Sequence, residues 1–127
     1  MSCQDLNFNL SGAEIDMSIC LMVSNPINEN EKCIYVPVST ERVFENYWLP
    51  AIEKLDLKWV RCFQCGIEIG KDELEPVKME LTELKNWLVE HMNNEQGVYI
   101  RDRIDNLCME MNQIFSKERE DIKLYIG

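Results

Sequence analysis

Alternating apolar and polar positions predict the first strands of the chain. Residues 15–23 place five apolar side chains on one face: Ile15, Met17, Ile19, Leu21 and Val23. This alternation is typical of a strand that packs one face against a core. Residues 6–10 alternate in the same way, so we expect a shorter strand there, with Ser11 and Gly12 forming the turn between the two.

Two segments that follow polar stretches also carry strand patterns. Residues 33–38 come after the polar loop 24–32 and are rich in β-branched and aromatic side chains, which predicts a strand antiparallel to the one at 15–23. Pro37 cannot donate a ladder hydrogen bond, so we expect it at a sheet edge or at a strand end. Apolar and polar residues alternate again over residues 122–126, which predicts a short C-terminal strand that ties the end of the chain to the sheet.

Residues 57–69 predict a third main strand that contains a C-x-x-C-G motif. The alternation runs from Trp59 to Ile69 and passes through Cys62 and Cys65. In a continuous strand, residues three apart point to opposite faces of the sheet. We therefore expect the two sulfurs to be too far apart to share a metal ion or to form a disulfide.

Apolar residues spaced three and four apart predict three helices. The first follows an N-cap at Ser39 or Thr40, and Pro50 inside it should kink it or split it in two. The second begins after Pro76, and the third begins near residue 98 or 99. The apolar stripe of the third helix consists of Ile100, Ile104, Leu107, Cys108, Met111, Ile114 and Phe115.

The order of these elements predicts one α+β domain over residues 1–127. A chain of 127 residues suits a single domain with one hydrophobic core. We expect a small, largely antiparallel sheet with about three helices packed on one face. A mixed α/β arrangement stays open, because the helical crossover at 40–56 is long enough to pair two strands in parallel.

The net charge narrows the classes of partner. The chain has 23 acidic and 13 basic residues and a formal charge of −10. Such a surface repels nucleic acid and anionic membranes, and it steers association toward a basic protein. The N-terminus shows no secretory signal, and no stretch approaches the ~20 apolar residues of a membrane span. We therefore expect a cytoplasmic protein whose six cysteines are mostly reduced.

The residues that could carry out catalysis or hold a metal ion are few. Cys62 and Cys65 are weak candidates for zinc ligands, because a structural zinc site needs a second pair of ligands that the sequence lacks. The other candidate ligands are scattered: Cys3, Cys20, Cys33, Cys108 and His91. His91 lies near a predicted helix end, where a structural role is favoured. With no nucleophile, phosphate-binding or EF-hand motif, we expect neither enzymatic activity nor a cofactor.

A group of acidic residues follows the predicted third strand and is the candidate partner-binding site. Residues 68–75 hold one base, Lys71, and four acids: Glu68, Asp72, Glu73 and Glu75. Carboxylates on a loop favour the approach of a basic partner and raise its association rate. The candidate aromatic anchors are Trp48, Trp59, Trp87, Tyr47 and Tyr99. We expect most of the Trp side chains in the core, with one edge exposed.

In overall character the chain resembles the bacterial immunity proteins, which are small, acidic, cytosolic inhibitors of protein toxins. The resemblance rests on size, charge, a compact mixture of helices and strands, and the lack of a catalytic signature. It implies a non-enzymatic protein that binds a cognate basic toxin, in many cases a nuclease. Such a protein blocks the toxin by plugging or covering it, often with carboxylates that mimic phosphates.

Two other functions stay open. One is a structural or adaptor domain that forms homo-oligomers through an exposed strand edge, for example that of residues 122–126. The other is a regulatory domain that binds zinc through the cysteines.

Overall fold

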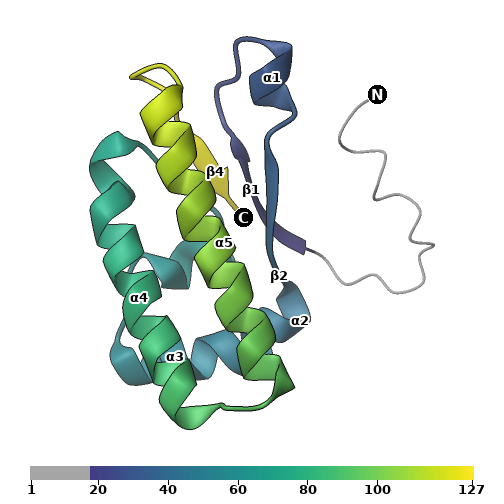
Figure 1. Ribbon diagram of the computed structural model, residues 1–127, viewed down its shortest axis with the longest axis vertical. Helices are drawn as coiled ribbons and strands as arrows, with labels where there is room; N and C mark the ends of the chain where they lie inside the picture. Colours follow the sequence, from purple (N-terminus) through teal and green to yellow (C-terminus); the bar gives the residue numbers. More distant parts are fainter. Residues whose placement is uncertain (1–17) are drawn as a thin grey trace, which may run out of the picture.

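The computed structural model describes residues 18–127, which form a four-stranded antiparallel sheet with helices packed on one face (Figure 1). The strands are β1 (Ser18–Val23), β2 (Tyr35–Thr40), β3 (Ile67–Ile69) and β4 (Leu124–Ile126). The longest helices, which lie side by side, are α4 (Leu74–His91) and α5 (Glu95–Lys117). The α+β fold class predicted from the sequence is confirmed. The predicted strand at 6–10, its turn at Ser11 and Gly12, and residues 15–17 lie outside the described residues.

β1 lies inside the sheet, between β2 and β4. Ile19, Leu21 and Val23 are buried, which confirms the apolar face predicted for this strand. β2 pairs antiparallel with β1, as predicted. Pro37 lies in β2 at the edge of the sheet, where its missing N–H leaves no ladder bond unmade.

The C-terminal strand β4 is also internal, which rules out an exposed edge at residues 122–126, and the alternative of a parallel pair is not found in the described sheet. β4 pairs antiparallel with β1 on one side and with β3 on the other, so residues 122–126 offer no exposed edge. All pairings in the described sheet are antiparallel, so the crossover at 40–56 creates no parallel pair. The reason is that this crossover carries the chain to the far edge of the sheet, where β3 meets β4 instead of β2.

The strand predicted for residues 57–69 is wrong over most of its length. Only Ile67–Ile69 form β3, while Val60–Phe63 form a 3₁₀ helix, η3. A carboxylate on α4, that of Glu80, accepts three backbone N–H groups at the start of η3, those of Lys58, Trp59 and Val60. These bonds take the amides that a sheet ladder would need. Gly66, with φ 106°, then turns the chain into β3.

The helix predicted after residue 40 forms in three pieces: α2 (Glu41–Val43), the π-helical turn η2 (Phe44–Trp48) and α3 (Leu49–Leu55). The Thr40 side chain accepts a hydrogen bond from the Val43 backbone N–H at 3.1 Å, which confirms the predicted cap. Pro50 is the second residue of α3 and directly follows the π-helical turn η2, and it has no N–H to donate to that turn. The chain stays helical from Glu41 to Leu55, so the expected split at this proline does not occur, and the helical bonding changes from π to α next to it.

Both long helices begin earlier than predicted. α4 begins two residues before Pro76, because a proline in the first helical turn has no intrahelical bond to lose. α5 begins directly after Asn94, whose side chain accepts the Gly97 N–H at 2.9 Å and caps the helix. Position 97, inside this helix, requires glycine, because a Cβ there would collide with the carbonyl oxygen of Met92.

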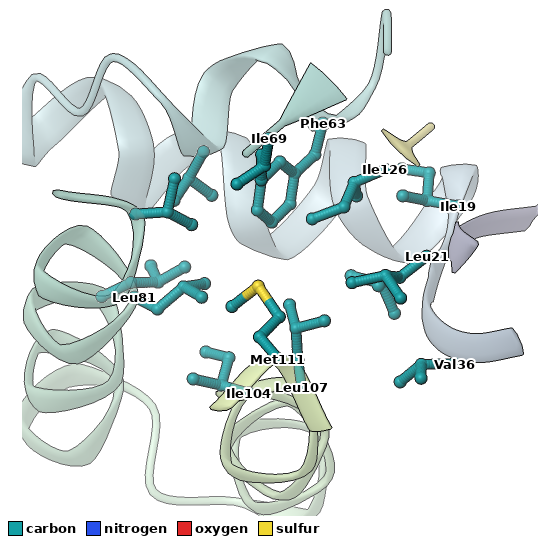
Figure 2. Packing of buried hydrophobic residues seen from close by; sticks show 14 of the residues in the cluster. Ile19, Leu21, Val36, Phe63, Ile69, Leu81, Ile104, Leu107, Met111 and Ile126 are labelled. Atoms are coloured by element: carbon teal, nitrogen blue, oxygen red, sulfur yellow. The ribbon is translucent and has the colours of Figure 1, made fainter. Parts of the chain in front are cut away.

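The core lies between one face of the sheet and the helices. Figure 2 shows Ile19, Leu21, Val36 and Ile126 of the sheet pointing toward Leu81 of α4 and toward Ile104, Leu107 and Met111 of α5. The apolar stripe predicted for α5 is buried except for Cys108, which is half-buried. This packing covers one face of the sheet, and no helix among residues 18–127 covers the opposite face.

A buried ion pair fixes the loop between β1 and β2. Glu31, in the short helix α1 (Glu29–Lys32), is only 2% exposed, and its two oxygens accept hydrogen bonds from the Arg119 guanidinium at 2.9 and 3.1 Å. Arg119 also donates to Asp121 at 2.8 Å and to the Asn25 carbonyl. The segment after α5 is thereby held against this loop. Hydrogen bonds from Arg119 hold the pKa values of Glu31 and Asp121 below their usual range.

The pair of Glu31 and Arg119 predicts a component of stability that depends on pH. The pKa of Glu31 lies below its ordinary value of 4.5 in the folded chain, so the unfolded state binds more protons in this range. The stabilisation is therefore present above about pH 4.5 and is lost as the pH falls through the lowered pKa. In urea unfolding, Glu31→Gln should be less stable than the parent at about pH 7, and the difference should shrink at about pH 3.

Glu29→Gln is the matched control for this prediction, because Glu29 is exposed on the same short helix. Its stability relative to the parent should change little with pH. A difference between Glu31→Gln and the parent that stays constant over this pH range would contradict the prediction.

Candidate functional site

The face of the sheet that points away from the helices carries the candidate site. The strand register places four side chains in one row across it: Tyr35 on β2, Met22 on β1, Tyr125 on β4 and Glu68 on β3. Directly opposed residues of antiparallel strands lie about 5 Å apart, so the row spans about 14 Å. Tyr35, Met22 and Tyr125 are 42%, 39% and 37% exposed. These four residues are termed the open-face row.

Small residues form the neighbouring row, and both tyrosines lean over it. This second row consists of Pro37, Cys20, Gly127 and Gly66. Tyr125 lies against Gly66 and Gly127, in the space that a Cβ on either glycine would need. The Tyr35 hydroxyl lies near the Cys20 thiol, and burial raises the pKa of both groups. The two rings are therefore held along the sheet.

Glu68 closes one end of the open-face row and is held by a residue that directly follows β1. Its Oε2 accepts the Ser24 hydroxyl at 2.6 Å. The Ser24 backbone N–H donates to the Lys123 carbonyl at 2.9 Å, and the Asn25 side chain accepts the Lys123 N–H at 3.0 Å. These bonds fix the end of β1 beside the start of β4 and so fix the serine that orients the carboxylate.

The free edge of β3 is closed at both ends. The amide of Gly66, before the strand, donates to the Cys62 carbonyl at 2.8 Å, and the amide of Gly70, after it, donates to the Glu73 side chain at 2.7 Å. Successive residues of β4 form their backbone hydrogen bonds alternately with β1 and with β3. Tyr125 bonds toward β1, so Glu68, which lies opposite it, is the residue of β3 whose backbone N–H and C=O point outward. One N–H and one C=O are too few to bind a partner strand.

The free edge of β2 is interrupted as well. Pro37 has no N–H to donate, and the register with β1 shifts between Ile19 and Cys20, which marks a bulge. Prolines and bulges are common devices that prevent edge-to-edge pairing. A partner is therefore expected on the open face of the sheet and not at one of its edges.

Of the four acidic residues predicted to bind a partner, Glu68 alone belongs to the open-face row. Asp72 is exposed on the short 3₁₀ helix η4 (Lys71–Glu73). Glu73 binds a backbone amide of the preceding turn, and Glu75 forms an exposed ion pair with a lysine of α4 at 3.5 Å. The fold thus places the last three acids around the start of α4 and separates them from Glu68.

The aromatic anchors predicted from the sequence lie mostly in or against the core. Trp48 is 1% exposed, and Trp59, Trp87 and Tyr47 are half-buried against the core, which confirms the expectation for the Trp side chains. Tyr99 is exposed on α5, where its hydroxyl accepts from the Arg103 guanidinium. Tyr35 and Tyr125 were not predicted as anchors. Both occupy outward positions of predicted strands, and a large aromatic residue at such a position is the signal that could have identified them.

The two cysteines of the C-x-x-C-G motif do not belong to a metal site in the part of the chain that the structure describes. That part contains no group of three or more His, Cys, Asp or Glu side chains that could hold a metal ion. Cys62 lies on η3 with its thiol 3.6 Å from the Lys58 carbonyl oxygen, and Cys65 is exposed in the following turn. The sequence pattern placed the two sulfurs on opposite faces of a continuous strand. This reason for their separation is wrong, because Val60–Phe63 form a 3₁₀ helix.

The only histidine of the sequence has the structural position that its place near a helix end predicts. His91 is the last residue of α4. Its ring stacks on that of Trp87 with a centroid distance of 4.4 Å, and its Nδ1 lies 3.0 Å from the Trp87 carbonyl oxygen. The His91 side chain therefore packs against its own helix.

The comparisons with known proteins give no lead on function. A scan against protein families finds no matching model, and no curated protein and no solved structure matches the chain. Among the described residues, no helix has the length and apolar character needed to cross a membrane. A function therefore has to be inferred from the open-face row and from the charge of the chain.

Proposed function

We propose that this chain is a non-enzymatic immunity protein of the cytoplasm, which covers and blocks a cognate basic protein toxin with the open face of its sheet. The observation that supports the proposal is the open-face row, in which two tyrosines and a methionine are exposed beside a carboxylate. Tyr and Met are enriched at protein interfaces, and Tyr is also enriched among the residues that dominate binding energy. Both edges of the sheet are closed to strand addition, which leaves the face as the surface for a partner.

The charge of the chain supports a basic partner. A net charge of −10 over 127 residues attracts a basic protein at long range and raises the association rate, and salt weakens this attraction. The internal position of β4 removes the exposed edge at residues 122–126, which was the example given for the homo-oligomer alternative. A partner of opposite charge therefore remains the better supported occupant of the open face.

Co-expression with the product of a neighbouring toxin gene tests the proposal. The chain should restore growth and should co-purify with the toxin in a complex that weakens with added salt. The proposal is overturned if the chain neither restores growth nor forms a complex. Elution of the purified chain well above 15.0 kDa without a partner would point instead to self-association through the same face.

Substitution in the middle of the open-face row should weaken the complex. Met22→Lys places a charge between the two tyrosines, where an interface is dry, and should raise the Kd by at least about tenfold. Met79→Lys is the matched control, because Met79 is 67% exposed on α4 and the change in charge is the same. Isothermal titration with folded variants measures both affinities. If the two variants bind equally well, the open face is not the binding surface.

A further inference from the structure

Tyr125 and Glu68 stand next to each other at one end of the open-face row. They are directly opposed between β4 and β3, which places their Cβ atoms about 5 Å apart on the same side of the sheet. Both side chains are exposed. An aromatic ring attracts a cation through its electron-rich face, and a neighbouring carboxylate attracts the same cation through its charge.

The ring of Tyr125 lies over two glycines, Gly66 and Gly127, which leave room for it. Its hydroxyl and the adjoining ring carbon occupy the space that a Cβ on Gly66 or Gly127 would need. Gly66 also has a φ of 106°, which side chains other than glycine rarely adopt. The backbone therefore requires glycine at this position and leaves the space that the ring fills. A ring that is already ordered loses little entropy when a partner stacks on it.

The carboxylate of Glu68 is oriented but is not paired with a cation of the described part of the chain. Its Oε2 accepts the Ser24 hydroxyl at 2.6 Å, and within residues 18–127 Glu68 takes part in no ion pair. Lys71, after β3, binds a glutamate beyond α5 at 3.2 Å. Lys123, before β4, extends along Gly70. Among residues 18–127 no donor binds the Oε1 atom of Glu68, so this atom can accept a hydrogen bond from a partner.

We infer that Tyr125 and Glu68 form a subsite for the guanidinium group of an arginine of the partner. A guanidinium is planar, so it can stack on the Tyr125 ring while its in-plane N–H groups donate to Glu68, and a compact ammonium group cannot do both. The charge of −10 favours such a cation. This inference rests on the proposed function, because it states which group of the toxin contacts the open face.

Titration of the full ¹⁵N-labelled chain with N-acetyl-arginine amide tests the subsite by NMR. We expect saturable shifts of the amides of Gly66, Glu68 and Tyr125 that weaken with added salt. N-acetyl-citrulline amide has nearly the same shape without the charge and should cause none. Glu68→Gln and Tyr125→Leu should each weaken arginine binding by about threefold to tenfold. Asp72→Asn removes an exposed acid outside the row and should leave binding unchanged.

Three results would overturn the subsite: equal shifts with the citrulline compound, no saturable shift with arginine, or unchanged arginine binding in Glu68→Gln. Tyr125→Phe keeps the ring and should keep the binding, and if Tyr125→Leu does not fold, the loss of binding in Glu68→Gln carries the test. The toxin complex separates this inference from the proposed function. If the complex forms with parental affinity in Glu68→Gln and Tyr125→Leu, the subsite is wrong and the immunity function stands. If arginine binds but no toxin complex forms, the immunity function is wrong.

Discussion

Replacement of Glu80 by alanine is expected to lower the free energy of unfolding by about 2–3 kcal/mol. The Glu80 carboxylate accepts the backbone N–H groups at the start of η3, those of Lys58, Trp59 and Val60, at 2.8, 2.8 and 2.9 Å. Val60 is 0% exposed, so its N–H cannot reach water unless the start of η3 opens. The expected loss exceeds that of an ordinary helix cap because one carboxylate serves three donors.

Glu83→Ala is the matched control for this prediction. Glu83 is exposed one turn further along α4 and makes no hydrogen bond or ion pair within the described part of the chain, so its removal should change stability by less than about 0.5 kcal/mol. Glu80→Gln keeps one acceptor oxygen and should fall between the two. Urea unfolding at constant pH measures all three variants. If Glu80→Ala is as stable as Glu83→Ala, water replaces the carboxylate and the contact does not hold η3.

The contact with Glu80 also explains why the strand predicted for residues 57–69 does not form. Val60 and Phe63 are buried and lie three apart, which is a helical spacing, while every second residue from 59 to 69 is mostly apolar. In so short a segment the two periods overlap, and local pattern alone does not separate them. The residue that decides between them, Glu80, lies 20 positions after Val60.

The fold class follows from the sequence, whereas the strand order does not. The buried faces of β1 and α5 agree with the predicted apolar stripes, because local periodicity determines which side of an element is apolar. The insertion of β4 between β1 and β3 depends on contacts such as that between Ser24 and Lys123, 99 positions apart. No local pattern contains that information.

The candidate site was predictable only in part, for the same reason. Glu68 was identified as an acid beside a strand. Tyr35, Met22 and Tyr125 become one surface with it only through the register of four strands. The other predicted acids lie close to Glu68 in sequence, but η4 and the first turn of α4 carry them away from the sheet. Nearness in sequence was therefore a poor guide to nearness on the surface.

Gly66→Ala is expected to lower the free energy of unfolding by about 2–3 kcal/mol, for two separate reasons. The first is the backbone, because a φ of 106° is strained for alanine. The second is the ring of Tyr125, because an alanine Cβ would occupy the place of its hydroxyl. The ring can swing away from the sheet, so the second cost is the smaller one.

A double-mutant cycle with Tyr125→Ala separates the two causes. Backbone strain persists in the double variant, whereas the collision disappears. Gly66→Ala should therefore cost about 1 kcal/mol less in the Tyr125→Ala background than in the parent. Equal costs in both backgrounds would show that Gly66 does not hold the ring, and the ordered ring of the arginine subsite would lose its physical basis. A cost below about 0.5 kcal/mol in the parent would contradict the backbone strain itself.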